Sequence, residues 1–100
     1  MIRHIVLFRL SATDPEIKRA NALALKERIE ALEGRIDGLL SVTIGLDLGY
    51  IGTHWDVGLV SEHADYAALE AYQAHPEHTP ILEFANSIAS EKAAVDYSVV

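Results

Sequence analysis

The stretch from residue 2 to residue 10 constrains the fold most, because it alternates like a β-strand and yet is largely apolar on both faces. One face carries Ile2, His4, Val6, Phe8 and Leu10. The other face has Ile5 and Leu7 between Arg3 and Arg9. A strand of this kind is normally covered on both sides. In a two-layer domain helices cover one face, so we expect the second face to pack against a partner.

The composition leads to the same expectation. A chain of 100 residues has room for one domain, residues 1–100, and a domain of that size buries about two-thirds of its unfolded surface. Hydrophobic residues make up 50% of the chain, which is more than so small an interior holds. We therefore expect some apolar surface to be buried between the subunits of a homodimer.

The charge balance excludes several classes of partner. Eight basic and 15 acidic residues give a net charge of −7, whereas a nucleic-acid-binding surface needs a basic stripe. Binding to anionic membranes is disfavoured for the same reason. The chain has no cysteine, which excludes disulfides and thiolate chemistry. Its first residues lack a signal-peptide pattern and are too few to span a bilayer, so we expect a cytoplasmic protein.

The hydrophobic pattern predicts a strand, a helix, two strands, a helical segment and a last strand. Asp14 before Pro15 is typical of a helix start, and we expect this helix to run to about Glu33 with Gly34 as its C-cap. The later predicted strands span residues 39–48, 54–60 and 92–99, and the short helices span 65–74 and 80–89. This order is that of the ferredoxin-like α+β sandwich, a four-stranded antiparallel sheet with helices on one face. Two such sheets packed face to face would form a dimeric α+β barrel.

Groups able to move a proton are concentrated between residues 71 and 78. Tyr72, His75 and His78 fall in this stretch, and Pro76 should end the helix that carries Tyr72. An imidazole takes or gives a proton near neutral pH, and a phenol donates a hydrogen bond to a developing oxyanion. Tyr72 and His78 are therefore the candidate catalytic pair. A core aromatic residue and a turn-capping histidine would have the same pattern, so both interpretations stay open.

Other polar residues are candidates for substrate binding. His4 lies on the strand face assigned to the helices and is expected beneath Tyr72 and His78. Asp96 on the last strand could accept a hydrogen bond from His78 and fix its tautomer. His54 starts the third predicted strand, where pocket rim and surface are equally expected.

Two histidines have simpler interpretations. His75 is also a candidate, although contact with the helix C-terminus would explain it without a function. His63 is interpreted as loop surface. Because Pro76 interrupts the spacing between His75 and His78, we expect no metal site.

Three segments resemble those of the stress-responsive A/B barrel (Dabb) family: the opening Ile2–Phe8, the Tyr72-x-x-His75-Pro76-x-His78 segment, and Asp96-Tyr97. The resemblance spans essentially the whole chain and implies a dimeric α+β barrel. A cofactor-free polyketide cyclase of the family uses a tyrosine and a histidine that match Tyr72 and His78 as its acid–base pair.

The resemblance extends to the pocket and also has a limit. Histidines on the first and third strands of that cyclase match His4 and His54, and a terminal-strand aspartate matches Asp96. The first predicted helix of this chain lacks the aromatic pocket residue of the cyclase, because no tyrosine occurs between Asp14 and Gly34.

Two functions are compatible with these features. The first is an enzyme without a cofactor, similar to a cyclase or lyase, acting on a small and mostly apolar carbonyl or phenolic compound. The second is a noncatalytic, stress-linked dimeric module that binds or stabilises other molecules. A cavity of substrate size lined by the candidate residues would favour the first.

Overall fold

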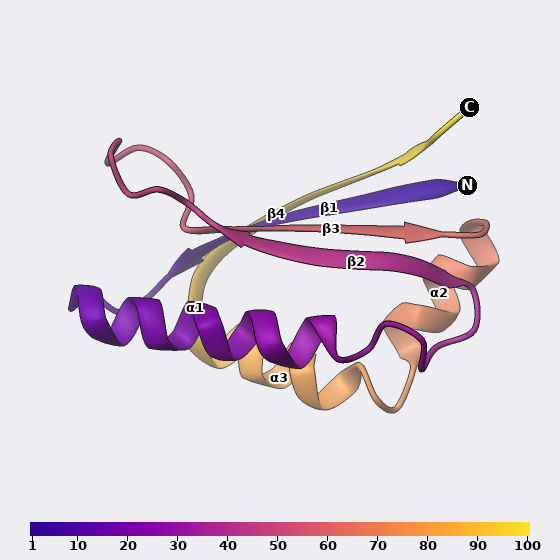
Figure 1. Cartoon of the computed structure of the whole chain (residues 1–100), viewed down its shortest axis with the longest axis horizontal. Helices are drawn as coiled ribbons and strands as arrows, with labels where there is room; N and C mark the ends of the chain where they lie inside the picture. The colour runs from indigo at the N-terminus through magenta and orange to yellow at the C-terminus, as the bar shows by residue number, and fades with distance from the viewer.

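The computed structural model describes residues 1–100. Its elements in chain order are β1 (Ile2–Leu10), α1 (Pro15–Glu30), β2 (Leu39–Leu46), β3 (Val57–His63), α2 (Tyr66–Ala74), α3 (Thr79–Ile88) and β4 (Ala89–Ser98). The strands form one antiparallel sheet in the order β2-β3-β1-β4. All three helices lie on the same side of this sheet (Figure 1). The predicted ferredoxin-like α+β sandwich is confirmed.

The first helix begins where the sequence predicts and ends one turn earlier. The Asp14 carboxylate accepts a hydrogen bond from the Glu16 backbone N–H at 2.8 Å, and Pro15 occupies the first turn. The helix ends at Glu30 rather than at residue 33. Tight turns follow, in which the Arg35 N–H donates to the Leu32 carbonyl at 3.0 Å. Gly34 is therefore a turn residue with a φ of +82° and not the C-cap.

The third strand lies three residues later than predicted. The Asp56 carboxylate accepts a hydrogen bond from the Leu10 backbone N–H at 2.7 Å, which holds the preceding residues in a loop. The strand then continues to His63, because β1 pairs with it as far as Ile2 opposite His63. Its buried side chains alternate along the strand, and Val57, Leu59 and Ser61 lie on the face toward the helices.

Helices cover one face of the sheet, and the other face is open. On the helix side, side chains such as Leu25 of α1 and Leu69 of α2 are buried against β1, β2 and β3. No element covers the opposite face, above which only the β2–β3 loop and the C-terminal end of the chain rise (Figure 1). Its central side chains, Ile5 and Leu7, are only half-buried. No helix combines the length and apolar character needed to cross a membrane.

Candidate active site

A cavity of about 290 Å³ lies between the sheet and helices α1, α2 and α3. Most of its walls are apolar, and polar groups enter it from β1, α2, the α2–α3 turn and β4. Its lining comprises His4, Val6, Phe8, Ile29, Leu59, Tyr72, Gln73, His78, Ile81, Leu82, Ala85, Lys92, Ala93 and Ala94. The volume is at the lower end of the range for ligand pockets. A small, mostly apolar molecule fits such a space.

Tyr72 places a buried phenol in this cavity. Helix α2 is capped by the Asp65 carboxylate, which accepts from the Ala68 N–H at 2.8 Å, and its inner face presents Leu69 and Tyr72. The Tyr72 side chain is 1% exposed, and its hydroxyl has no hydrogen-bond partner in the protein. Burial raises the pKa of Tyr72 to about 12. The phenol therefore remains protonated at neutral pH and is available as a hydrogen-bond donor.

His78 lies directly against this phenol. The chain leaves α2 in extended geometry at His75, before Pro76, and the next turn brings the His78 ring to 4.5 Å from the Tyr72 ring. Its Nδ1 atom is buried and has no partner. Burial lowers the pKa of His78 below the ordinary value of 6.5. The imidazole is therefore neutral at pH 7, and one ring nitrogen can accept a proton.

His4 and Asp96 form a pair across neighbouring strands. The two residues are opposite each other in the β1–β4 register, and the His4 Nδ1 atom hydrogen-bonds the Asp96 carboxylate. The expectation that Asp96 pairs with His78 is therefore wrong, because the strand register gives this carboxylate to His4. A carboxylate on Nδ1 fixes the tautomer and leaves Nε2 as an acceptor in the neutral ring.

The interpretation of His63 as loop surface is wrong, because this residue is fully buried at the end of β3. Its Nε2 atom lies 2.8 Å from the Ser61 hydroxyl, and its ring is 4.8 Å from Tyr72 and 6.3 Å from His4. Burial lowers its pKa, with a smaller contribution from His4. Continuing the alternation of β3 past Val60 would have predicted this inward position.

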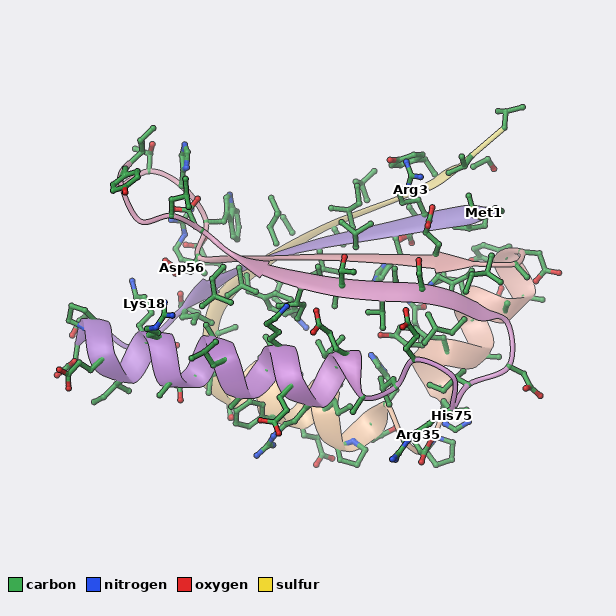
Figure 2. The ribbon with its side chains drawn as sticks, viewed as in Figure 1. Met1, Arg3, Lys18, Arg35, Asp56 and His75 are labelled. Atoms are coloured by element: carbon green, nitrogen blue, oxygen red, sulfur yellow. The ribbon has the colours of Figure 1, made fainter.

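His54 and His75 do not line the cavity that contains Tyr72 and His78. The His54 ring is exposed in the β2–β3 loop, with Nδ1 3.1 Å from the Asp47 carboxylate. The His75 Nδ1 atom accepts from the Glu77 backbone N–H at 3.1 Å. Figure 2 shows His75 at the corner between α2 and α3, away from the sheet.

Comparison with known proteins identifies the family. The sequence matches the model of the stress responsive A/B barrel domain (Dabb) over residues 2–99. The chain belongs to the Dabb family. The resemblance noted in the sequence is therefore confirmed. No curated protein matches the chain.

Solved structures similar to this Dabb chain share its fold. A dimeric protein of unknown function from Bacteroides fragilis has 32% identity and a TM-score of 0.88, covering 98% of this chain and 95% of its own. A dimeric ferredoxin-like protein of unknown function from Thermobifida fusca has 26% identity and a TM-score of 0.81, with 98% and 90% covered. The hydroxynitrile lyase of Passiflora edulis has 14% identity and a TM-score of 0.78, with 99% and 92% covered.

The candidate residues of this Dabb protein do not form a ligand set for a metal. The structure contains no group of three or more His, Cys, Asp or Glu side chains suited to hold an ion. His75 and His78, which are three residues apart, are divided between the outer corner and the cavity wall. The polar groups that line the cavity are the Tyr72 phenol, the His4 and His78 imidazoles, the Gln73 amide and the Lys92 ammonium.

The buried histidines predict that acid destabilises the fold. Folding lowers the pKa of both His63 and His78 below 6.5, so below that pH the unfolded chain binds protons that the folded chain does not. Their stabilising contribution is complete above about pH 6.5 and is lost as the pH falls through the lower folded values. We expect urea denaturation to give a smaller free energy of unfolding at pH 5.5 than at pH 7.5.

Replacing His63 with phenylalanine isolates the contribution of His63 to this pH dependence. The phenylalanine side chain keeps a ring in the core and cannot be protonated. The difference in the free energy of unfolding between the two pH values is expected to be smaller in the variant than in the wild type. An unchanged or larger difference would show that His63 does not resist protonation in the folded state.

Proposed function

We propose that this Dabb protein binds a small, mostly apolar carbonyl or phenolic compound in the cavity and acts on it by acid–base catalysis without a cofactor. The observation that supports this most is the pairing of two orphaned polar atoms, the Tyr72 hydroxyl and His78 Nδ1, in adjacent buried rings. Buried polar groups are nearly always hydrogen-bonded in proteins. A ligand that accepts from Tyr72 and donates to His78 would satisfy both atoms.

Proton abstraction next to a carbonyl group uses both residues. The carbonyl oxygen accepts the Tyr72 hydrogen bond, and neutral His78 takes a proton from the adjacent carbon. The carbon–hydrogen electron pair forms the enolate, whose oxygen is stabilised by the phenol. The imidazolium so formed then returns the proton to carbon or to a leaving group. Because burial lowers the pKa of His78, this return is favourable.

The same pair suits a lyase step. In such a step His78 would take the proton of a ligand hydroxyl as a neighbouring carbon–carbon bond breaks, and the bond electrons would leave with the departing group. The structurally similar Passiflora edulis protein is named a hydroxynitrile lyase, which supports lyase chemistry on this fold. His4, oriented by Asp96, would supply a second acceptor for the substrate.

Binding of a phenolic or β-diketone probe tests this proposal. We expect Tyr72→Phe and His78→Ala each to weaken binding about tenfold, as measured by isothermal titration calorimetry, because each removes one buried hydrogen bond. Tyr72→Phe should leave the free energy of unfolding unchanged or raise it, since the lost hydroxyl has no protein partner. Unaltered affinity in both variants, or no binding by the wild type, would contradict the proposal.

His75→Ala is the matched control. It removes an imidazole from the same segment, but His75 does not line the cavity. We expect this variant to bind the probe with wild-type affinity.

A homodimer formed through the uncovered sheet face is the second part of the proposal. The centre of this face is apolar, with Ile5, Leu7, Val60 and Val95 half-buried or exposed. Polar pairs border it: Arg3 and Glu62 are 2.8 Å apart at one end, and the Arg9 guanidinium lies 4.5 Å from the Trp55 ring at the other. Figure 2 shows Arg3 on the side of the sheet opposite the helices. An apolar centre with a polar rim is typical of protein interfaces.

The alternative function, a noncatalytic dimeric binding or stabilising module, is favoured by the same sheet face. It requires the homodimer and assigns the cavity histidines to packing. It therefore predicts that His78→Ala changes stability alone and that no carbonyl or phenolic probe is bound or converted.

A further inference from the structure

Lys92 is the only lysine, arginine, aspartate or glutamate in the cavity lining. The chain as a whole has 15 acidic and 8 basic residues, so the charge of the cavity is opposite in sign to that of the molecule. The other polar side chains of the lining are imidazoles, a phenol and an amide. No carboxylate lines this space to repel an anion.

The position of Lys92 is defined by two elements. It lies opposite Phe8 in the β1–β4 register, and its Nζ atom donates to the Asn86 side-chain carbonyl of α3 at 2.8 Å. Lys92 takes part in none of the seven ion pairs of the chain. Asn86 is a neutral partner, so the ammonium group keeps its charge uncompensated and has two further N–H groups to donate.

Lys92 also acts on the proposed reactive end of the cavity. Burial lowers the pKa of His78 most, a hydrogen bond to the Gln73 backbone raises it, and His4 and then Lys92 lower it further by charge repulsion. The ammonium is therefore within electrostatic reach of the imidazole. Both groups line the same cavity of about 290 Å³.

We propose that the ligand of this cavity is a monoanion: an apolar carbonyl or phenolic compound with one carboxylate that pairs with Lys92 at the rim. Its carbonyl or hydroxyl group then meets Tyr72 and His78, so the inference depends on the proposed function. The excess of acidic groups elsewhere repels anions at a distance, and recognition is thus local to Lys92. The pairing neutralises an ammonium that has no acidic partner in the protein.

A matched pair of probes tests this inference. 4-Hydroxybenzoate and its methyl ester share a phenolic body and differ in charge. We expect the wild type to bind the acid about fivefold more tightly than the ester in isothermal titration calorimetry, as expected for a partly exposed ion pair. The preference should decrease in 0.5 M salt, because screening weakens such a pair.

Variants at position 92 test whether Lys92 causes the preference for the acid over the ester. Lys92→Gln should bind the acid and the ester equally, and Lys92→Arg should retain the preference. Lys18→Gln is the control with the same change in net charge, because Lys18 pairs with Asp56 at 3.4 Å outside the cavity (Figure 2). It should behave as the wild type does.

The outcomes separate the two proposals. If the wild type binds both probes equally, or if the acid preference survives in Lys92→Gln, the inference about a monoanion is wrong and the proposed function stands. If neither probe binds, the proposed ligand site is wrong and the inference is overturned with it.

Discussion

Replacing Leu7 with aspartate is expected to dissociate the proposed homodimer, raising its dissociation constant at least about 100-fold. Leu7 lies at the centre of the uncovered sheet face, between Ile5 and Arg9 on β1 and opposite Gly58 of β3. In a face-to-face dimer each subunit would bury an aspartate, and the neighbouring Arg9 is already paired with Glu91 at 3.1 Å. An uncompensated buried charge costs about 3–5 kcal/mol, which corresponds to this change in affinity or more.

Sedimentation velocity at micromolar concentration measures this effect. The wild type should sediment as a dimer and Leu7→Asp as a folded monomer. Leu23→Asp is the matched control, because Leu23 is 43% exposed on α1, on the helix side of the sheet. The control should remain dimeric. A dimer that persists in Leu7→Asp would mean that the subunits associate through another surface.

Replacing Gly38 with alanine is expected to lower the free energy of unfolding by about 3 kcal/mol. Gly38 has a φ of +84°, and a Cβ atom there would lie 2.6 Å from the Ala68 Cβ atom of α2. Its carbonyl accepts from the Ala64 N–H at 2.9 Å, which fixes the start of β2 against the segment leading into α2. The backbone strain and the clash are two separate penalties at one position.

Gly34→Ala separates these two penalties. Gly34 has nearly the same φ, +82°, but a Cβ atom there would have no neighbour within 4 Å. In this control the free energy of unfolding should fall only by the cost of the backbone strain, about 1 kcal/mol. Chemical denaturation measures both variants. Equal losses at the two positions would show that the contact with Ala68 relaxes freely.

Much of the fold follows from local features of the sequence. The β1 alternation, the Asp14–Pro15 helix start and the break at Pro76 each depend on residues that are close in sequence, and each is found as predicted. The differences occur at element ends. Helix α1 stops before Gly34 because the chain changes to tight turns at Ala31. The residue types in this stretch do not indicate that change.

The arrangement of the candidate site depends on contacts between distant segments. Asp96 pairs with His4 rather than His78 because of the β1–β4 register, which local patterns do not determine. His63 was missed because β3 was placed three residues too early, and that error treated a buried position as a loop. The same error placed His54 at the start of the strand, whereas it lies in the β2–β3 loop.

A crystal structure with bound 4-hydroxybenzoate tests the central claim most directly. We predict ligand density in the cavity, with one oxygen atom about 2.6–3.2 Å from the Tyr72 hydroxyl and a donor at similar distance from His78 Nδ1. Ligand bound only elsewhere on the protein would contradict the account. So would a cavity that stays empty at saturating concentration while Tyr72 and His78 find partners within the protein.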